Sequence, residues 1–310
     1  MPFQNHYYSG QGILWVGERD ATGRPKSMRR VGNIPELTIN IEVTKFEHKE
    51  SESGNRLKDL VIIQEKNGTF SFTLENIDLD NLALGLWGSK ASVAGASVTN
   101  ETSYLEAGMR SPLKHPGIST VVVEADASKV PDWTLNTAIA VGEYRAATGA
   151  GTHYFVATVA GTTSGTEPTW NVSGSTTTDG TVTWQDAGVL PTAALTITTD
   201  YVVDAGLGAL STPDNKFPYG LPVIVDYAYA AYTRVDAFTQ ANAPERYLRF
   251  EGVNTVDGKK VIVEFFKAQF DPLTGYGLIN EELGTLTMNG SLLADTLQVA
   301  GSQYFKQINL

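Results

Sequence analysis

Strict alternation of apolar and polar residues is the feature that most constrains how this chain can fold. In residues 37–43, leucine, isoleucine and valine occupy every second position, with Thr, Asn and Glu between them. Successive side chains of a β-strand point to opposite faces, so the pattern predicts a strand with one buried face. Alternation on both sides of Asp257-Gly258 predicts a hairpin over residues 248–265, and a further strand is predicted at 285–289. The expected core is therefore antiparallel β-structure.

A hairpin and a projecting loop are predicted near the N-terminus. Apolar runs at residues 60–64 and 70–74 flank Asn67-Gly68, a dipeptide typical of two-residue hairpin turns. We therefore expect a hairpin that turns at these two residues. The preceding stretch, residues 45–56, is too polar to bury and too long for a tight turn, so we expect it to project as a loop.

One helix is predicted between residues 78 and 87. Asp78 is a suitable N-cap residue, and Gly88 is placed to end the helix. Leu79, Leu82 and Leu86 share one stripe at helical spacing. We expect this apolar stripe to pack across a face of the sheet.

The composition excludes several classes of function. The 310 residues contain no cysteine, which removes disulfide scaffolds, thiolate metal sites and cysteine nucleophiles. The formal net charge of −11 argues against tight DNA binding, which depends on clustered Lys and Arg. No apolar run approaches the roughly 20 residues of a membrane-spanning helix, and residues 1–6 lack a secretory signal pattern. We expect no membrane insertion, and folding in a cytoplasm.

The motifs offer little support for catalysis. The four histidines are scattered and show no metal-ligand spacing. They are His6, His48, His115 and His153. No nucleophile elbow, phosphate-binding loop or dinucleotide fingerprint occurs. We therefore predict that the protein is not an enzyme and has no catalytic residue, cofactor or metal site.

A change in composition predicts an inserted domain. Over residues 131–190, Gly, Thr and Ser increase, and Arg145 is the only basic residue. Strands expected at residues 120–124 and 195–203 flank this stretch, and an inserted domain needs chain ends that lie close together. The sequence predicts a small β-sandwich-like insert that projects outward from a larger domain made of residues 1–130 and 191–310.

The aromatic residues of the insert allow two interpretations. They are Trp133, Tyr144, Tyr154, Trp170 and Trp184. In a module of about 60 residues, large aromatic side chains usually form the core, because so small a domain must bury large apolar groups. Exposed aromatic rings would instead offer a platform on which sugar rings stack. The sequence leaves both interpretations open.

The order of these features resembles that of the tail tube proteins of long-tailed bacteriophages. The resemblance covers about residues 30–125 and 195–300. It lies in the strand that begins at Pro35-Glu36-Leu37, the charged loop at 45–58, the segments 67–75 and 81–88, and the strands at 223–229, 261–270 and 284–290. The insert resembles an immunoglobulin-like or carbohydrate-binding-like β module common in phage and bacterial surface proteins.

The resemblance implies a mainly β fold, a tail-tube β-sandwich or partly closed barrel with one flanking α-helix. It implies six copies in a ring, rings stacked into a tube, and DNA passing through the lumen into the host without specific binding. Partners implied in the same way are the protein itself and the tape measure, tail terminator and distal tail proteins. The expected location is the tail of the virion, assembled in the host cytoplasm.

Two sets of residues are candidates for this function. The charged loop is long enough to reach an adjacent ring, and its candidate contact residues are Glu47, Lys49, Glu50, Glu52, Arg56 and Lys58. An acidic lumen would resist adhesion of DNA, because phosphate pairing needs Lys and Arg. The candidate lumen residues, on polar faces of the predicted strands, are Asn40, Glu42 and Glu75.

The alternative function is a surface adhesin or carbohydrate-binding protein that acts through the Trp-rich insert, with host-surface glycans as partners. Electron microscopy separates the two hypotheses, because a tube subunit forms rings or tubes with a central hole. A monomer that binds glycans would favour the adhesin.

Overall fold

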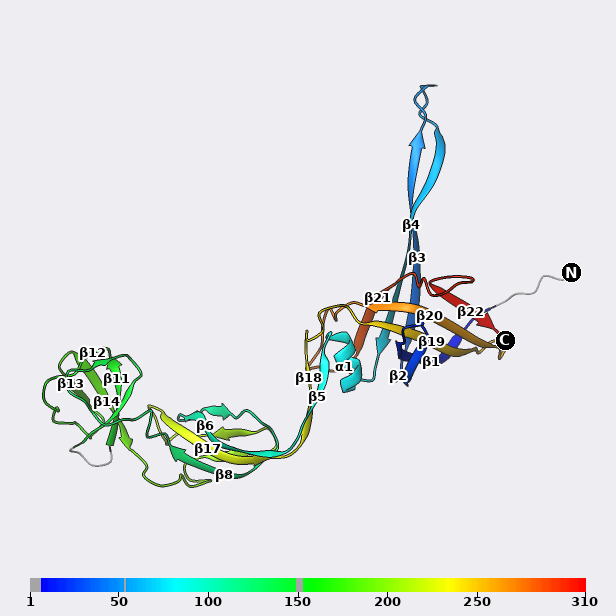
Figure 1. The fold of residues 1–310 in the computed structure, drawn as a ribbon. Helices are drawn as coiled ribbons and strands as arrows, with labels where there is room; N and C mark the ends of the chain where they lie inside the picture. The colour runs from blue at the N-terminus through cyan, green and yellow to red at the C-terminus, as the bar shows by residue number, and fades with distance from the viewer. Residues whose placement is uncertain (1–6, 53, 149–152) are drawn as a thin grey trace. The chain divides into compact units, whose positions relative to one another are not determined.

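The computed structural model describes residues 7–52, 54–148 and 153–310 and shows a mainly β protein (Figure 1). The chain forms two compact units. Unit 1 consists of Met1–Ala91 and Thr233–Leu310, and unit 2 is Ser92–Tyr232. The described residues contain one α-helix, and all the strand pairs with an assigned register are antiparallel. The predicted mainly β fold class is confirmed.

Unit 1 is built on one eight-stranded sheet. Its strands are β1 (Gly10–Arg19), β2 (Pro25–Arg30), β3 (Glu36–Lys49), β4 (Lys58–Leu74), β19 (Glu245–Asn254), β20 (Lys260–Phe270), β21 (Leu286–Leu292) and β22 (Phe305–Asn309). The order is β2-β1-β19-β20-β21-β4-β3, and β22 pairs with the first half of β20. The path is open, because β2 and β3 lie at its two ends.

The core of unit 1 lies on the face of the sheet that carries the alternating apolar residues. Phe70 of β4 is 1% exposed, and its ring packs edge-on against Phe270, with 5.1 Å between centroids. Gly290 of β21 lies opposite Phe70, where an added Cβ would come within 2.1 Å of the Gln269 carbonyl. The strands approach so closely here that only glycine fits.

The helix α1 (Leu79–Gly85) is present but shorter than predicted. Asp78 is the N-cap, and its Oδ1 accepts a hydrogen bond from the Asn81 backbone N–H at 2.7 Å. The predicted apolar stripe is only partly correct. Leu84 and Asn81 are buried, whereas Leu79 is 38% exposed. The Asn81 amide donates to the Val31 carbonyl at 2.8 Å, so a polar contact, which apolar periodicity does not detect, orients the helix on the sheet.

The predicted hairpin at Asn67-Gly68 is wrong. β4 runs unbroken through both residues, which pair with Glu42 and Ile41 of β3. Neither residue has the positive φ that a two-residue hairpin turn requires. The chain turns instead between Glu50 and Leu57, whose backbones are joined by a 2.8 Å hydrogen bond. Residues 45–49 of the predicted loop are therefore strand. Long-range pairing on both edges of β4 outweighs the local turn preference.

Two further predictions for unit 1 agree with the structure. β19 and β20 form the hairpin predicted around Asp257-Gly258, and Gly258 has a φ of 73°. β21 (Leu286–Leu292) contains residues 286–289 of the strand predicted at 285–289.

The described residues of unit 2 form four small sheets. One sheet has the order β6 (Ala96–Leu105), β17 (Leu221–Tyr229), β8 (Ile118–Ala125). A second has the order β15 (Val202–Asp204), β16 (Ala209–Ser211), β7 (Arg110–Pro112). A third has the order β10 (Tyr144–Ala146), β11 (His153–Val159), β14 (Val182–Val189), β13 (Thr176–Asp179). The fourth pairs β12 (Gly161–Thr162) with β9 (Ala138–Ile139). The two remaining strands, β5 (Ser89–Val93) and β18 (Tyr232–Asp236), pair with one another.

The compact unit that contains the predicted insert is larger than residues 131–190. Tyr144 and Tyr154, inside that stretch, share a hydrophobic cluster with Leu105 and Leu221, outside it. The Tyr154 hydroxyl also donates to the Gly220 carbonyl at 2.8 Å. Residues 131–190 have a second, separate cluster around Trp184, but one of their faces packs on the rest of unit 2. The predicted boundaries at 130 and 190 mark a change of composition. The boundaries of unit 2 lie further apart in the sequence, because residues outside 131–190 share its hydrophobic core.

Candidate functional site

The outer ends of β3 and β4 form a two-stranded ribbon, which we call the arm and define as residues 43–52 and 54–66. Figure 1 shows this ribbon continuing beyond the other strands of unit 1. All described residues of the arm except Glu50 are exposed, so both faces of the ribbon are open to solvent. The register pairs Phe46 with Ile62 and His48 with Leu60 on one face, and Glu47 with Val61 on the other.

The arm exposes an unusual amount of apolar surface. Residues 60–63, Leu-Val-Ile-Ile, are each between 46% and 55% exposed, and Phe46 is 46% exposed. Because neighbouring residues of a strand point to opposite faces, this run places apolar side chains on both sides of the ribbon. A run of four exposed apolar residues is unfavourable in water unless a partner covers it. The arm therefore has the exposed apolar character of a surface that a partner would cover.

The predicted contact residues gather in the outer part of the arm. Glu47 and Lys49 lie on β3, Lys58 begins β4, and Glu52 and Arg56 lie in the turn. Lys58 Nζ contacts Glu47 Oε1 at 2.5 Å, and this hydrogen bond lowers the pKa of the Glu47 carboxyl below its usual range.

Glu50 has a structural role in the turn. Its carboxylate accepts hydrogen bonds from the backbone N–H groups of Glu52 at 2.8 Å and Leu57 at 3.3 Å. These bonds hold the two ends of the turn together, so Glu50 fixes the conformation of the tip.

The inner halves of β3 and β4, together with β21, carry a second surface, which we call the polar face. The register aligns Thr38 with Ser71 and Asn289, and Asn40 with Thr69 and Ser291. The complete face consists of Glu36, Thr38, Asn40, Glu42, Asn67, Thr69, Ser71, Thr73, Thr287, Asn289 and Ser291. It contains no Lys or Arg, and the opposite side of the same strands is the core of unit 1.

The polar face has a definite chemical character. Its side chains are short hydroxyls and amides, with carboxylates at Glu36 and Glu42. Hydroxyls and amides are well hydrated but neutral, and the carboxylates repel phosphate groups. A nucleic acid beside this surface would find no cation with which to form a phosphate ion pair. The polar face can therefore border DNA without retaining it.

Two of the three predicted lumen residues lie on the polar face. Asn40 and Glu42 are both exposed on β3. Glu75 follows the last residue of β4, where Asn33 holds it through a side-chain hydrogen bond of 2.5 Å and its backbone N–H donates to the Asn33 carbonyl. Sequence reasoning missed the Ser, Thr and Asn residues of β4 and β21. Their alternation is visible in the sequence, but only the register shows that they share one surface.

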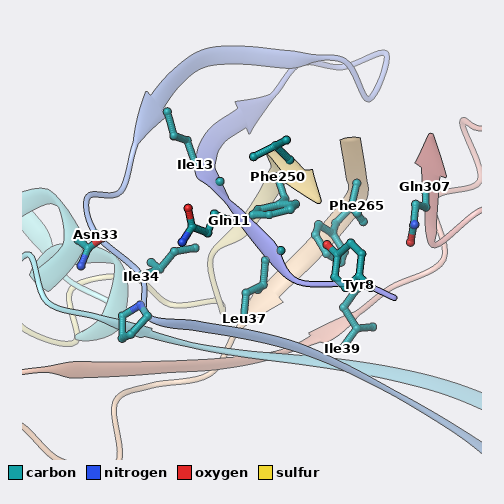
Figure 2. A pocket seen from close by; sticks show the side chains of 15 residues that line it. Tyr8, Gln11, Ile13, Asn33, Ile34, Leu37, Ile39, Phe250, Phe265 and Gln307 are labelled. Atoms are coloured by element: carbon teal, nitrogen blue, oxygen red, sulfur yellow. The ribbon is translucent and has the colours of Figure 1, made fainter. Parts of the chain in front are cut away.

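A cavity of about 950 Å³, which we call the seam, opens between β1 and β3. Figure 2 shows Ile13, Leu37, Ile39, Phe250 and Phe265 around it, with Tyr8 and Gln307 at one side. Both bordering strands have unpaired edges. β2 pairs only with residues 15–19 of β1, and β3 pairs only with β4 in the part of the chain that the structure describes. Unpaired strand edges beside an open cavity favour pairing with another chain.

Comparison with known proteins identifies the family. Residues 7–184 and 156–308 match the profile of a family described as "Protein of unknown function UCP028589". The chain belongs to this family. No curated protein matches it.

In this member of the family, most of the predicted insert aromatics form core. Trp184 and Tyr154 are fully buried, and Trp133 and Tyr144 are at most 9% exposed. Trp170 is half-buried and stacks on Phe155, with 4.1 Å between ring centroids. Four of the five rings are therefore inaccessible to a sugar. This burial favours the core interpretation over the sugar-stacking platform.

Asp179 organises this aromatic core. Its Oδ2 accepts hydrogen bonds from the indole N–H groups of Trp133 at 2.7 Å and Trp184 at 3.1 Å, and its Oδ1 accepts one from the Ser164 backbone at 2.8 Å. Burial acts to raise the pKa of the Asp179 carboxyl, but these hydrogen bonds outweigh it and hold the pKa below its usual value.

We expect Asp179→Asn to lower the free energy of unfolding of unit 2 at neutral pH by about 1–3 kcal/mol, because an amide leaves a buried hydrogen-bonding group without a suitable partner. In the native protein, the ionised Asp179 carboxylate contributes its full stabilisation at pH values above the unfolded-state pKa of about 3.9. This stabilisation is lost as the pH falls through the folded-state pKa, which is lower. Urea unfolding followed by tryptophan fluorescence measures both effects. Asp214→Asn, at an exposed position, is the control. Equal losses in the two variants would contradict the assignment.

No group of three or more His, Cys, Asp or Glu side chains in residues 7–52, 54–148 and 153–310 is arranged to hold a metal ion. His6, one of the four scattered histidines, lies outside these residues. No helix among the described residues is long and apolar enough to cross a membrane.

Proposed function

We propose that this protein is a structural subunit of the tail tube of a long-tailed bacteriophage, as its sequence resemblance implies. One observation carries the proposal. The same two strands, β3 and β4, bear the polar face on their inner halves and the exposed apolar arm on their outer halves. A subunit that must both assemble and line a channel needs these two surfaces.

The arm provides the axial contact of the proposed tube. A tube needs one heterologous contact that closes into a ring and another that continues from ring to ring. The arm extends along the direction of β3 and β4 and carries apolar residues that nothing in the described part of unit 1 covers. Docking on the next ring would remove the Leu60, Val61, Ile62 and Ile63 side chains from water.

The seam and the free strand edges support the lateral contact. β2 and β3, at the two ends of the open sheet, would meet the sheets of neighbouring copies. Such pairing satisfies backbone N–H and C=O groups that are otherwise an aggregation hazard. Six copies in a ring follow from the resemblance, as do the tape measure, tail terminator and distal tail proteins as partners and the virion tail as the location.

The polar face provides the lumen surface in this proposal. With no Lys or Arg on the face and a net charge of −11 on the chain, the lumen would be hydrated and repulsive to phosphate. DNA would then pass into the host without counterion-release binding. In this role the protein is not an enzyme and uses no cofactor.

Electron microscopy of the concentrated protein tests the proposal. Rings or tubes with a central hole are expected, and their interior should stain as an open channel. A particle that remains monomeric at every concentration, in low and moderate salt, contradicts it. Glycan-array binding by such a monomer would support the surface adhesin instead.

A further inference from the structure

A second cavity, of about 410 Å³, lies within unit 1 and is lined by residues of β1, β2 and α1. Its charged side chains are Arg29, Arg246, Lys90, Glu18 and Asp80, three cations and two anions. An excess of positive charge in one cavity is notable on a chain with a net charge of −11. Neither the polar face nor the arm includes any of these residues.

Arg29 and Arg246 are half-buried and form no ion pair with any described residue. In the described part of the chain, Arg29 Nη1 donates to Asn81 Oδ1 at 2.7 Å and Arg246 Nη1 donates to its neighbouring Glu245 carbonyl at 2.9 Å, and neither forms an ion pair. Lys90, by contrast, is neutralised by Asp80 at 3.0 Å. Two guanidinium groups that form no ion pair leave several N–H donors free to bind an anion, and Glu18 acts on Arg246 through its charge alone.

The positive charges of the two guanidinium groups repel one another. Burial lowers the pKa of Arg246; Glu18 partly opposes this effect, and the charge of Arg29 adds to it. Arginine nevertheless stays charged at neutral pH. An anion between the two groups would relieve both the desolvation and the repulsion.

The backbone beside the cavity is arranged unusually. The pairing of β1 with β2 shifts register between Val16 and Glu18, which places Ser27 and Met28 in a β-bulge. Ser27, which lines the cavity, has a φ of 53°. Bulges redirect side chains, and left-handed conformations of non-glycine residues are often retained at binding sites. The bulge brings the Ser27 hydroxyl and the Arg29 guanidinium to the same cavity.

We propose that this cavity is a binding site for a tetrahedral oxyanion such as inorganic phosphate, held by Arg29 and Arg246 with Ser27 as an additional donor. Planar guanidinium groups bind phosphate through paired N–H donors. The cavity is larger than a bare phosphate, so a phosphomonoester is the second source of the same chemistry. This inference does not depend on the proposed tube function.

The test is a titration of the full-length protein with inorganic phosphate, with chloride replaced at constant ionic strength. A ligand that binds only the folded state raises Tm in proportion to the logarithm of its concentration above Kd. We expect a saturable interaction by calorimetry and a rising Tm. Arg246→Gln should weaken binding by about tenfold to a hundredfold, as expected when a charge-assisted hydrogen bond is lost. Arg29→Lys, which keeps the charge but loses the planar fork, should also weaken it.

The matched control is Arg234→Gln, which removes an equal charge from an exposed side chain paired with Asp236. It should bind phosphate as the native protein does. If Arg246→Gln does not fold, Arg246→Lys replaces it, with weaker binding expected. Equal phosphate affinity in the native protein and the folded Arg246 variant overturns the proposal, as does the absence of any effect beyond chloride. A parallel titration with a nucleoside 5′-monophosphate shows which ligand supplies the bound phosphate group. Tighter binding than that of phosphate points to a phosphomonoester, and equal binding points to the free ion.

Discussion

A Leu60→Asp, Ile62→Asp double variant is expected to fold normally and to lose axial stacking. Both side chains lie on one face of the arm, beside Phe46, and are 49% and 48% exposed, so folding does not require them to be apolar. If docking buries these side chains, the substitutions remove about 1.5 kcal/mol of burial free energy at each position. The affinity of each arm contact then falls by roughly a hundredfold or more. Burying the introduced carboxylates would cost still more.

Sedimentation velocity and negative-stain microscopy measure this result. The native protein should give stacked particles, and the variant single rings or monomers with an unchanged circular dichroism spectrum. The matched control is Val141→Asp, Leu207→Asp, which places the same charges at exposed apolar positions of unit 2. Stacks of normal length in the arm variant would rule out the arm as the axial contact.

An Asn40→Lys, Thr287→Lys variant is expected to convert the polar face into a DNA-retaining surface. Both residues are exposed, and they lie on β3 and β21 without facing one another across the β4 ladder. Each subunit gains two cations on this face, so a ring of six gains twelve. Binding through 6–10 phosphates weakens by about 10³–10⁵ between 50 and 200 mM salt, so the acquired affinity should show that dependence.

Filter binding of duplex DNA to assembled particles, over a range of salt concentrations, gives the measurement. Native particles should show little binding, and the variant should bind strongly at low salt. Val141→Lys, Leu207→Lys adds equal charge in unit 2 and controls for net charge. If the control retains DNA as strongly as the Asn40 variant, the polar face does not line the channel. In an infecting phage, the same two lysines should slow ejection of the genome.

Local sequence patterns predicted the elements that local interactions determine. The β19–β20 hairpin has a Gly258 that takes the left-handed conformation the turn needs, and α1 has the Asp78 N-cap at the predicted position. The prediction failed at Asn67-Gly68, where β3 on one edge and β21 on the other keep β4 extended. A turn preference of one dipeptide is small beside two ladders of backbone hydrogen bonds.

The candidate site was predictable only in part. Asn40, Glu42 and the charged residues of the arm tip follow from the strand at residues 37–43 and the polar stretch after it. The remainder of the polar face joins Ser71 to Asn289, which are 218 positions apart, through a register that local patterns do not contain. Residues 60–63 were predicted to be part of one strand of a hairpin that turns at Asn67-Gly68. Their exposure follows from the length of β3, which continues far past the sheet.

The length of the β3–β4 ribbon also has a mechanical consequence. A force applied along paired strands is borne by many interstrand hydrogen bonds at once, so a load on the tip of the arm would be shared along the ladder. The register shift between Thr44 and Lys45 interrupts this ladder at the inner end of the arm. A β-bulge bends a strand and increases its local twist. If the proposed tube bends, the shift at Thr44 would absorb curvature while the inner halves of β3 and β4 keep their geometry.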